Sequence, residues 1–112
     1  MIWEPYDDGD TIGQEGSENG VIMRDDEHPM GARITLERDT RVAPFAITCG
    51  VYGLMFHTRF LATEADALTQ FEAMRDALTQ IIAAIPAPGD PEADAKMAAV
   101  SEALNLFVDQ YP

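Results

Sequence analysis

The chain has 112 residues, a formal net charge of −13, 46% hydrophobic residues and one cysteine. This length fits one domain with its own core, and one cysteine excludes an internal disulfide. Because so acidic a surface repels nucleic-acid phosphates and anionic lipids, we expect no nucleic-acid partner and no membrane partner. The sequence shows no apolar leader and no membrane-spanning stretch, so we expect a cytoplasmic protein.

The charge divides the chain into two parts. Residues 1–20 are acidic and Gly-rich, with six acids and no base. We therefore separate an N-terminal segment, residues 1–20, from a single domain, residues 21–112. A segment of this composition is disordered on its own. Trp3 and Tyr6 are costly to leave in water, which favours docking of the segment on the domain or on a partner.

The first part of the domain indicates two strands. Residues 21–24 read as a short strand and residues 25–31, DDEHPMG, as a hairpin connection with turn residues. Residues 32–38 alternate, with Ile34 and Leu36 inward and polar neighbours outward, which predicts a second strand.

Two acidic runs contain residue types that can bind a metal ion. Residues 25–28 offer four possible ligands, but sequence neighbours cannot easily aim at one ion. Asp8, Asp10 and Ile12 match a calcium loop only in part, since an apolar residue stands at a ligand position. We expect no metal and no other cofactor.

The stretch PFAITCGVYGLMFHTRFL, residues 44–61, predicts a central hairpin. With Tyr52-Gly53 as a two-residue turn, Val51 lies opposite Leu54 and Cys49 opposite Phe56. This register puts one nearly all-apolar face on the core: Phe45, Ile47, Cys49, Val51, Leu54, Phe56, Thr58 and Phe60. Replacing Phe56 with Ala should then cost about 3–5 kcal/mol. The opposite face carries Ala46, Thr48, Gly50, Met55, His57 and Arg59.

The same register bears on catalysis by the single cysteine. It places Cys49 and His57 on opposite faces, so the histidine cannot act as the base for a thiol nucleophile. A small buried side chain is the expected role of Cys49. With no catalytic group identified, we expect no enzyme.

After residue 61 the apolar period changes to that of a helix. Thr63-x-x-Asp66 resembles a capping box, and an apolar stripe extends the first helix to Ile85. A Pro-rich break, residues 86–91, follows. Asp90 as N-cap and Pro91 at the first helical position begin the second helix, whose apolar stripe reaches Tyr111.

The predicted architecture is α+β, a four-stranded antiparallel meander with two C-terminal amphipathic helices packed on one face (β-β-β-β-α-α). The other face of the sheet, with small residues in its middle, is the expected binding surface. Its candidate ligand- or partner-binding residues are Arg33, Thr48, Tyr52, His57 and Arg59.

Three functions fit this surface. The first is a non-enzymatic protein-interaction or regulatory module, with a basic protein or a second copy of the chain as partner. The second is a site for a small anion, or a weak enzyme, around Arg33, His57 and Arg59. The third is self-contact, in which the acidic segment lies across the sheet with Trp3 or Tyr6 over Gly50.

Overall fold

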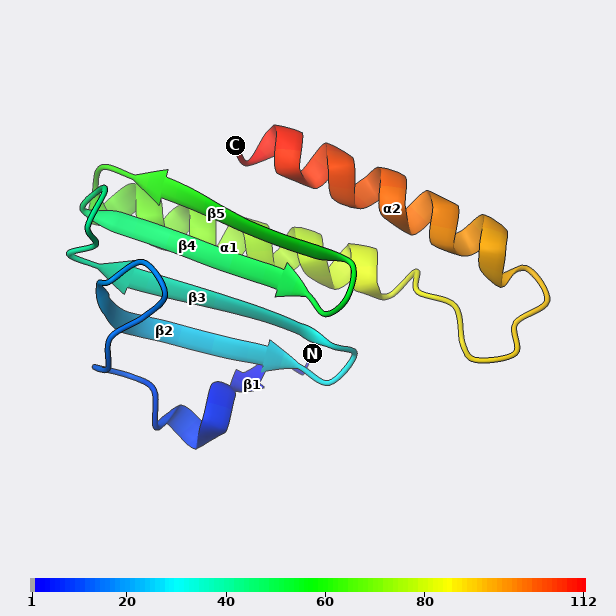
Figure 1. Cartoon of the computed structure of the whole chain (residues 1–112), viewed down its shortest axis with the longest axis horizontal. Helices are drawn as coiled ribbons and strands as arrows, with labels where there is room; N and C mark the ends of the chain where they lie inside the picture. The colour runs from blue at the N-terminus through cyan, green and yellow to red at the C-terminus, as the bar shows by residue number, and fades with distance from the viewer. Residues whose placement is uncertain (1) are drawn as a thin grey trace.

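A computed structural model describes residues 2–112 and shows an α+β fold (Figure 1). Five antiparallel strands form a meander in the order β1-β2-β3-β4-β5, and two helices follow. The bounds are β1 Glu4–Pro5, η1 (a short 3-10 helix) Tyr6–Gly9, β2 Val21–His28, β3 Ala32–Arg38, β4 Phe45–Val51, β5 Met55–Leu61, α1 Glu64–Ile82 and α2 Ala93–Gln110. The predicted fold class is confirmed. The strand count was one short, because the two-residue β1 pairs with β2.

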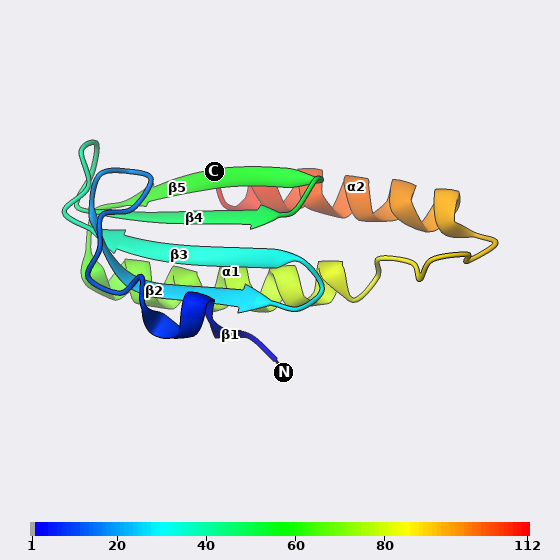
Figure 2. The same cartoon turned by 60° about the horizontal axis from the view of Figure 1, so that its bottom comes forward.

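The sheet forms one layer and the helices the other. In both views α1 lies behind the strands, and α2 follows a long connection and lies beside α1 (Figures 1 and 2). Helix α1 thus covers one face of the sheet and α2 packs against α1 beyond the β5 edge (Figure 1). We call the opposite face of the sheet the outer face. Among the described residues, no helix combines the length and apolar character needed to cross a membrane. The core between the layers is built mainly from Ile34, Leu36, Ile47, Cys49, Val51, Phe71, Met74, Leu78, Ile82, Val100, Leu104 and Phe107.

The start of the first helix follows the sequence signal, and that of the second does not. Thr63 Oγ1 accepts a hydrogen bond from the Asp66 N–H at 3.2 Å, so Thr63 caps α1 as predicted. The first helix ends at Ile82, earlier than expected. The second begins at Ala93, two residues later than expected, with Glu92 and not Asp90 at its N-cap, so this predicted start is wrong. Asp90 Oδ1 accepts from the Glu92 N–H at 2.8 Å and stabilises the turn that leads into the helix.

The connection predicted at residues 25–31 is instead mostly strand. β2 continues to His28, and only residues 29–31 form the turn. The strand alternates: Asp25 faces outward beneath the N-terminal segment, whereas Asp26 meets Arg75 of α1 at 2.7 Å. Charged side chains on both faces leave this strand without the apolar alternation that predicts strands. Asp25 and Asp26 are paired with Arg33 of β3 and Arg75 of α1 instead of packing as apolar residues would.

The central hairpin has a three-residue turn, and the predicted register is wrong by one residue. The Leu54 N–H donates to Val51 O at 2.9 Å, and Gly53 has φ +78°. Val51 therefore pairs with Met55, and Cys49 with His57. A slip of one residue exchanges the faces of a strand. Phe56 and Phe60 consequently lie on the outer face, while His57 and Arg59 face the helices.

The turn chemistry explains the difference. A two-residue hairpin turn of the favoured kind requires positive φ at its first central position, which suits Asn, Asp or Gly rather than Tyr52. In the observed register Phe56 lies opposite Gly50 and Phe60 opposite Ala46, so each ring stands beside a small residue. Phe56 is 74% exposed, and its predicted place in the core is wrong.

Candidate functional site

The N-terminal segment docks on the domain. It runs along β2 and turns over the end of the sheet where β2 begins (Figure 2). The Tyr6 ring stacks on the Arg33 guanidinium, with 3.6 Å from Cζ to the ring centroid. On the helix side, Trp3 Nε1 donates to Thr79 Oγ1 at 2.8 Å. Docking is confirmed, but neither aromatic ring lies where it was expected, over Gly50.

Asp25 is the first of two buried carboxylates that hold the segment. Its oxygens accept from Arg33 Nε at 2.9 Å, Arg33 Nη2 at 2.7 Å, Thr35 Oγ1 at 3.0 Å and Thr11 Oγ1 at 2.8 Å. The hydrogen bond to Asp25 is the main cause that raises the pKa of Arg33. Nε and Nη2 of the Arg33 guanidinium therefore already donate to Asp25, which leaves fewer donors for an external ligand.

Glu37 is the second buried carboxylate, and backbone groups satisfy it. It is fully buried and accepts from the Gly20 N–H at 3.0 Å and the Glu18 N–H at 3.2 Å. No Lys or Arg of the described chain forms an ion pair with it. A Cβ on Gly16 would lie 2.3 Å from Glu37 Cδ, so only glycine lets the backbone approach the carboxylate this closely.

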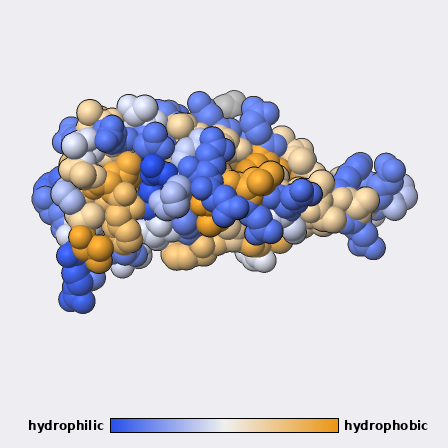
Figure 3. Space-filling view, turned by 90° about the horizontal axis from the view of Figure 1, so that it is seen from above, coloured by the Kyte–Doolittle hydropathy of each residue, from blue (hydrophilic) through white to orange (hydrophobic). Residues whose placement is uncertain are grey.

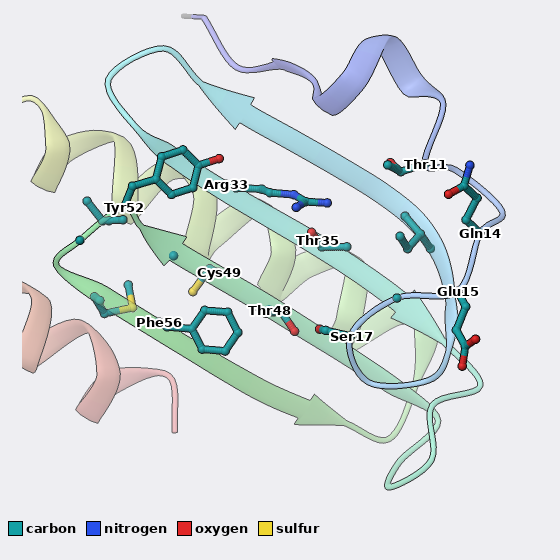
Figure 4. Close-up of a pocket in the computed structure, with 16 residues that line it drawn as sticks. Thr11, Gln14, Glu15, Ser17, Arg33, Thr35, Thr48, Cys49, Tyr52 and Phe56 are labelled. Carbon is teal, nitrogen blue, oxygen red and sulfur yellow. The ribbon is translucent and has the colours of Figure 1, made fainter.

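Between this loop and the β4–β5 turn lies a pocket of about 480 Å³ on the outer face (Figure 4). Its volume falls within the usual range for ligand sites, about 300–1,000 Å³. Arg33, Thr35, Thr48, Gln14, Glu15 and Ser17 supply polar groups. Phe56, Tyr52, Met55, Ile22 and Gly50 are among the other lining residues.

The structure brings together three of the five predicted site residues. Arg33, Thr48 and Tyr52 line the pocket. The Tyr52 hydroxyl donates to Glu27 Oε2 at 2.6 Å, and burial together with this bond raises the Tyr52 pKa to about 12.

The other two predicted residues lie on the helix side. His57 Nε2 is 2.5 Å from the carbonyl oxygen of Tyr111, and the Arg59 guanidinium is 5.8 Å from the Tyr111 ring. Arg59 Nε is buried and has no hydrogen-bond partner among residues 2–112. Both side chains thus meet the C-terminal end of α2, where the helix dipole favours cations. Arg33 and Arg59 cannot hold one anion together.

Sequence reasoning missed the pocket's walls at Gln14, Glu15, Ser17 and Phe56. The register error removed Phe56 from the outer face. The remaining walls come from the N-terminal segment, and Gly16 and Gly20, which flank its loop, were the available signal: a Cβ on either would lie closer than 3 Å to the neighbouring strand.

The correct register puts Cys49 and His57 on the same face as cross-strand partners, which overturns their expected separation. No hydrogen bond joins the two side chains among the described residues, since His57 Nε2 lies instead against the carbonyl oxygen of Tyr111. Burial also raises the pKa of the Cys49 thiol to about 12. Within the described residues, no three His, Cys, Asp or Glu side chains are grouped so that they could hold a metal ion.

Exposed hydrophobic side chains lie beside the pocket. Tyr52, Leu54, Phe56 and Phe60 follow the β4–β5 turn and the outer side of β5, and we call them the β5 strip. All four are more than 40% exposed. Seen from the side of β5 and α2, strongly hydrophobic surface gathers in separate areas among hydrophilic and weakly hydrophobic ones (Figure 3).

The charges near the surface are mainly negative. Five of the seven Lys and Arg side chains form ion pairs with acids of the chain: Arg24, Arg33, Arg38, Arg75 and Lys96. Because most of the 20 acids have no such partner, the charge offered to another molecule is acidic over most of the surface.

No protein-family model matches the sequence, and neither a curated protein nor a solved structure matches it significantly.

Proposed function

We propose that this chain is a non-enzymatic, cytoplasmic protein-interaction module that binds a basic protein through the β5 strip. The observation that carries the proposal is the outward register of β5, which leaves Phe56 74% exposed on a regular strand. Large aromatic side chains at the surface are typical anchors of protein interfaces. The hairpin that presents this ring is regular and paired over seven residues, so the anchor needs little ordering on binding.

Charge identifies the kind of partner. The net charge of −13 and the internal pairing of most cations favour a partner with clustered Lys and Arg. A second copy of the chain is less favourable, because stacking two strips brings two strongly acidic molecules together.

The anion site considered from the sequence has less support. Arg33 is committed to Asp25, while His57 and Arg59 lie on the other face. The carboxylates of Glu15 and Glu37 also stand near the pocket, which opposes entry of an anion.

The test is capture of a partner from lysate of the source organism at low salt. Wild type is compared with Phe56→Ser in the strip and with Leu106→Ser on α2, where another leucine is highly exposed. We expect one stoichiometric basic protein that elutes as salt is raised, is lost with Phe56→Ser and is retained by Leu106→Ser.

Two results would contradict the proposal. One is a partner that Phe56→Ser retains as well as wild type does. The other is a homodimer in light scattering with no captured partner, which would assign the strip to self-association.

A further inference from the structure

We propose that the pocket on the outer face receives a lysine or arginine side chain of the basic partner. This inference rests on the proposed function and adds a second contact, next to the β5 strip. Phe56 belongs to both, since it lines the pocket and projects from the strip. A partner anchored on Phe56 is therefore already beside the pocket mouth.

The pocket offers a surface for the aliphatic stem. Thr48 of β4 lies at its floor, and Phe56 and Tyr52 stand at its sides (Figure 4). Gly50, also of β4, is another lining residue and pairs with Phe56. A Cβ on Gly50 would lie 3.3 Å from the Met55 carbonyl oxygen and 3.8 Å from Phe56 Cδ2, so the β5 backbone and the Phe56 ring closely border β4 at this point. Long basic side chains characteristically pack their methylene groups on apolar surface and keep the charged end among polar groups.

The charges around the pocket favour a cation. Glu15 is a lining residue at the rim, where its exposed carboxylate accepts from Asn19 Nδ2 at 3.1 Å and points away from the cavity (Figure 4). Glu37 lies directly under the backbone of Gly16, another lining residue. Arg33 is the one cation among the lining residues, and its charge is balanced by Asp25 at 2.7 Å. The net charge beside the pocket, near the loop of residues 14–20, is thus negative. Because the carboxylate of Glu37 is buried, solvent screens its electric field only weakly.

Neutral acceptors complete the site. The side-chain oxygens of Gln14, Ser17 and Thr48 belong to lining residues and can accept from an ammonium or guanidinium group. The Gln14 amide nitrogen already donates to Asp10 O at 2.7 Å, which leaves its amide oxygen as the free group.

The test is a titration of the full chain with Nα-acetyl-arginine methylamide at low salt. Binding is monitored by the NMR chemical shifts of the backbone amides. The citrulline analogue, which has the same shape and no charge, is the matched probe. We expect weak binding, roughly millimolar as suits a ligand of this size, with shifts at Gly16, Thr48, Gly50 and Phe56 and much smaller shifts with citrulline.

Two charge-removing variants sharpen the result. Glu15→Gln should weaken arginine binding roughly two- to fivefold, as for a partly exposed ion pair. Glu102→Gln removes an exposed acid on α2 and should leave it unchanged. Equal binding of citrulline, equal weakening by both variants or the absence of shifts at these amides would overturn the inference.

The two proposals fail separately. If the Phe56-dependent partner is captured but the arginine probe produces no shifts in the pocket, the module stands and this site is wrong. If the probe binds but no partner is captured, the proposed function fails and the cation pocket remains.

Discussion

The two halves of the outer face treat their side chains in opposite ways. Over β2 and β3, Asp25 and Glu37 are buried under the N-terminal segment and hydrogen-bonded within the chain. Over β4 and β5, no described segment covers the sheet, the small residues Ala46 and Gly50 lie opposite Phe60 and Phe56, and Phe56 projects into solvent. Polar residues on the outer side of a strand can therefore be buried by another segment of the chain, whereas aromatic residues on the outer side of a strand can be exposed to solvent.

The largest contrast is expected between two phenylalanines. Phe71 of α1 is fully buried, so Phe71→Ala should lower the free energy of unfolding by about 3–5 kcal/mol. Phe56→Ala should change it by less than about 1 kcal/mol, because the ring is mostly in water already. Urea unfolding measures both. Equal losses would mean that Phe56 is a core residue after all.

Removing the hydrogen bonds that hold the N-terminal segment on β2 and β3 should cause the next largest loss in the free energy of unfolding. Asp25→Ala leaves Arg33, Thr11 and Thr35 without their shared acceptor and should cost about 3 kcal/mol, the low end for a buried pair because Arg33 is partly exposed. Asp10→Ala removes an exposed acid of the same segment and serves as control. Similar losses in thermal or urea unfolding would show that the hydrogen bonds of Asp25 are unimportant.

A smaller loss is expected where the loop approaches the sheet. A Cβ on Gly20 would lie 2.5 Å from the carbonyl oxygen of Arg38, so Gly20→Ala should cost about 1–3 kcal/mol. Hydrogen exchange should accelerate at the Glu18 and Gly20 amides that bond Glu37. Ser17→Ala, in the same loop, should leave both measurements unchanged, and protection retained in the Gly20 variant would contradict the close approach.

The smallest effect concerns pH. Burial lowers the pKa of His28 from 6.5, and Nδ1 of this ring accepts from the Met30 N–H at 3.1 Å. The unfolded chain therefore binds the proton more readily, and stability should fall as pH drops below 6.5, by up to about 1 kcal/mol near pH 5.5. The His28→Gln variant should show a shallower slope in urea unfolding between pH 7.5 and 5.5, and parallel slopes would refute the assignment.

The sequence predicted correctly those helices and strands that are determined by residues close together in the chain. Thr63 caps its helix, and the alternation of residues 32–38 matches β3 residue for residue. The β5 register depended on the length of one turn, and counting apolar residues favoured the wrong one. Half of the candidate site was unpredictable for another reason: the segment that builds its wall is positioned by Asp25 and Glu37, whose partners are set by tertiary contact and not by any periodicity.

The bond between Trp3 and Thr79 sets an order of events during synthesis. Its two residues are 76 positions apart, so the ribosome makes Thr79 roughly 4–15 s after Trp3 at common elongation rates. During that interval the N-terminal segment has no helix to bind, and its acidity keeps the growing chain apart from its neighbours. The side chain of Trp3 can therefore reach its final place only after α1 has been made.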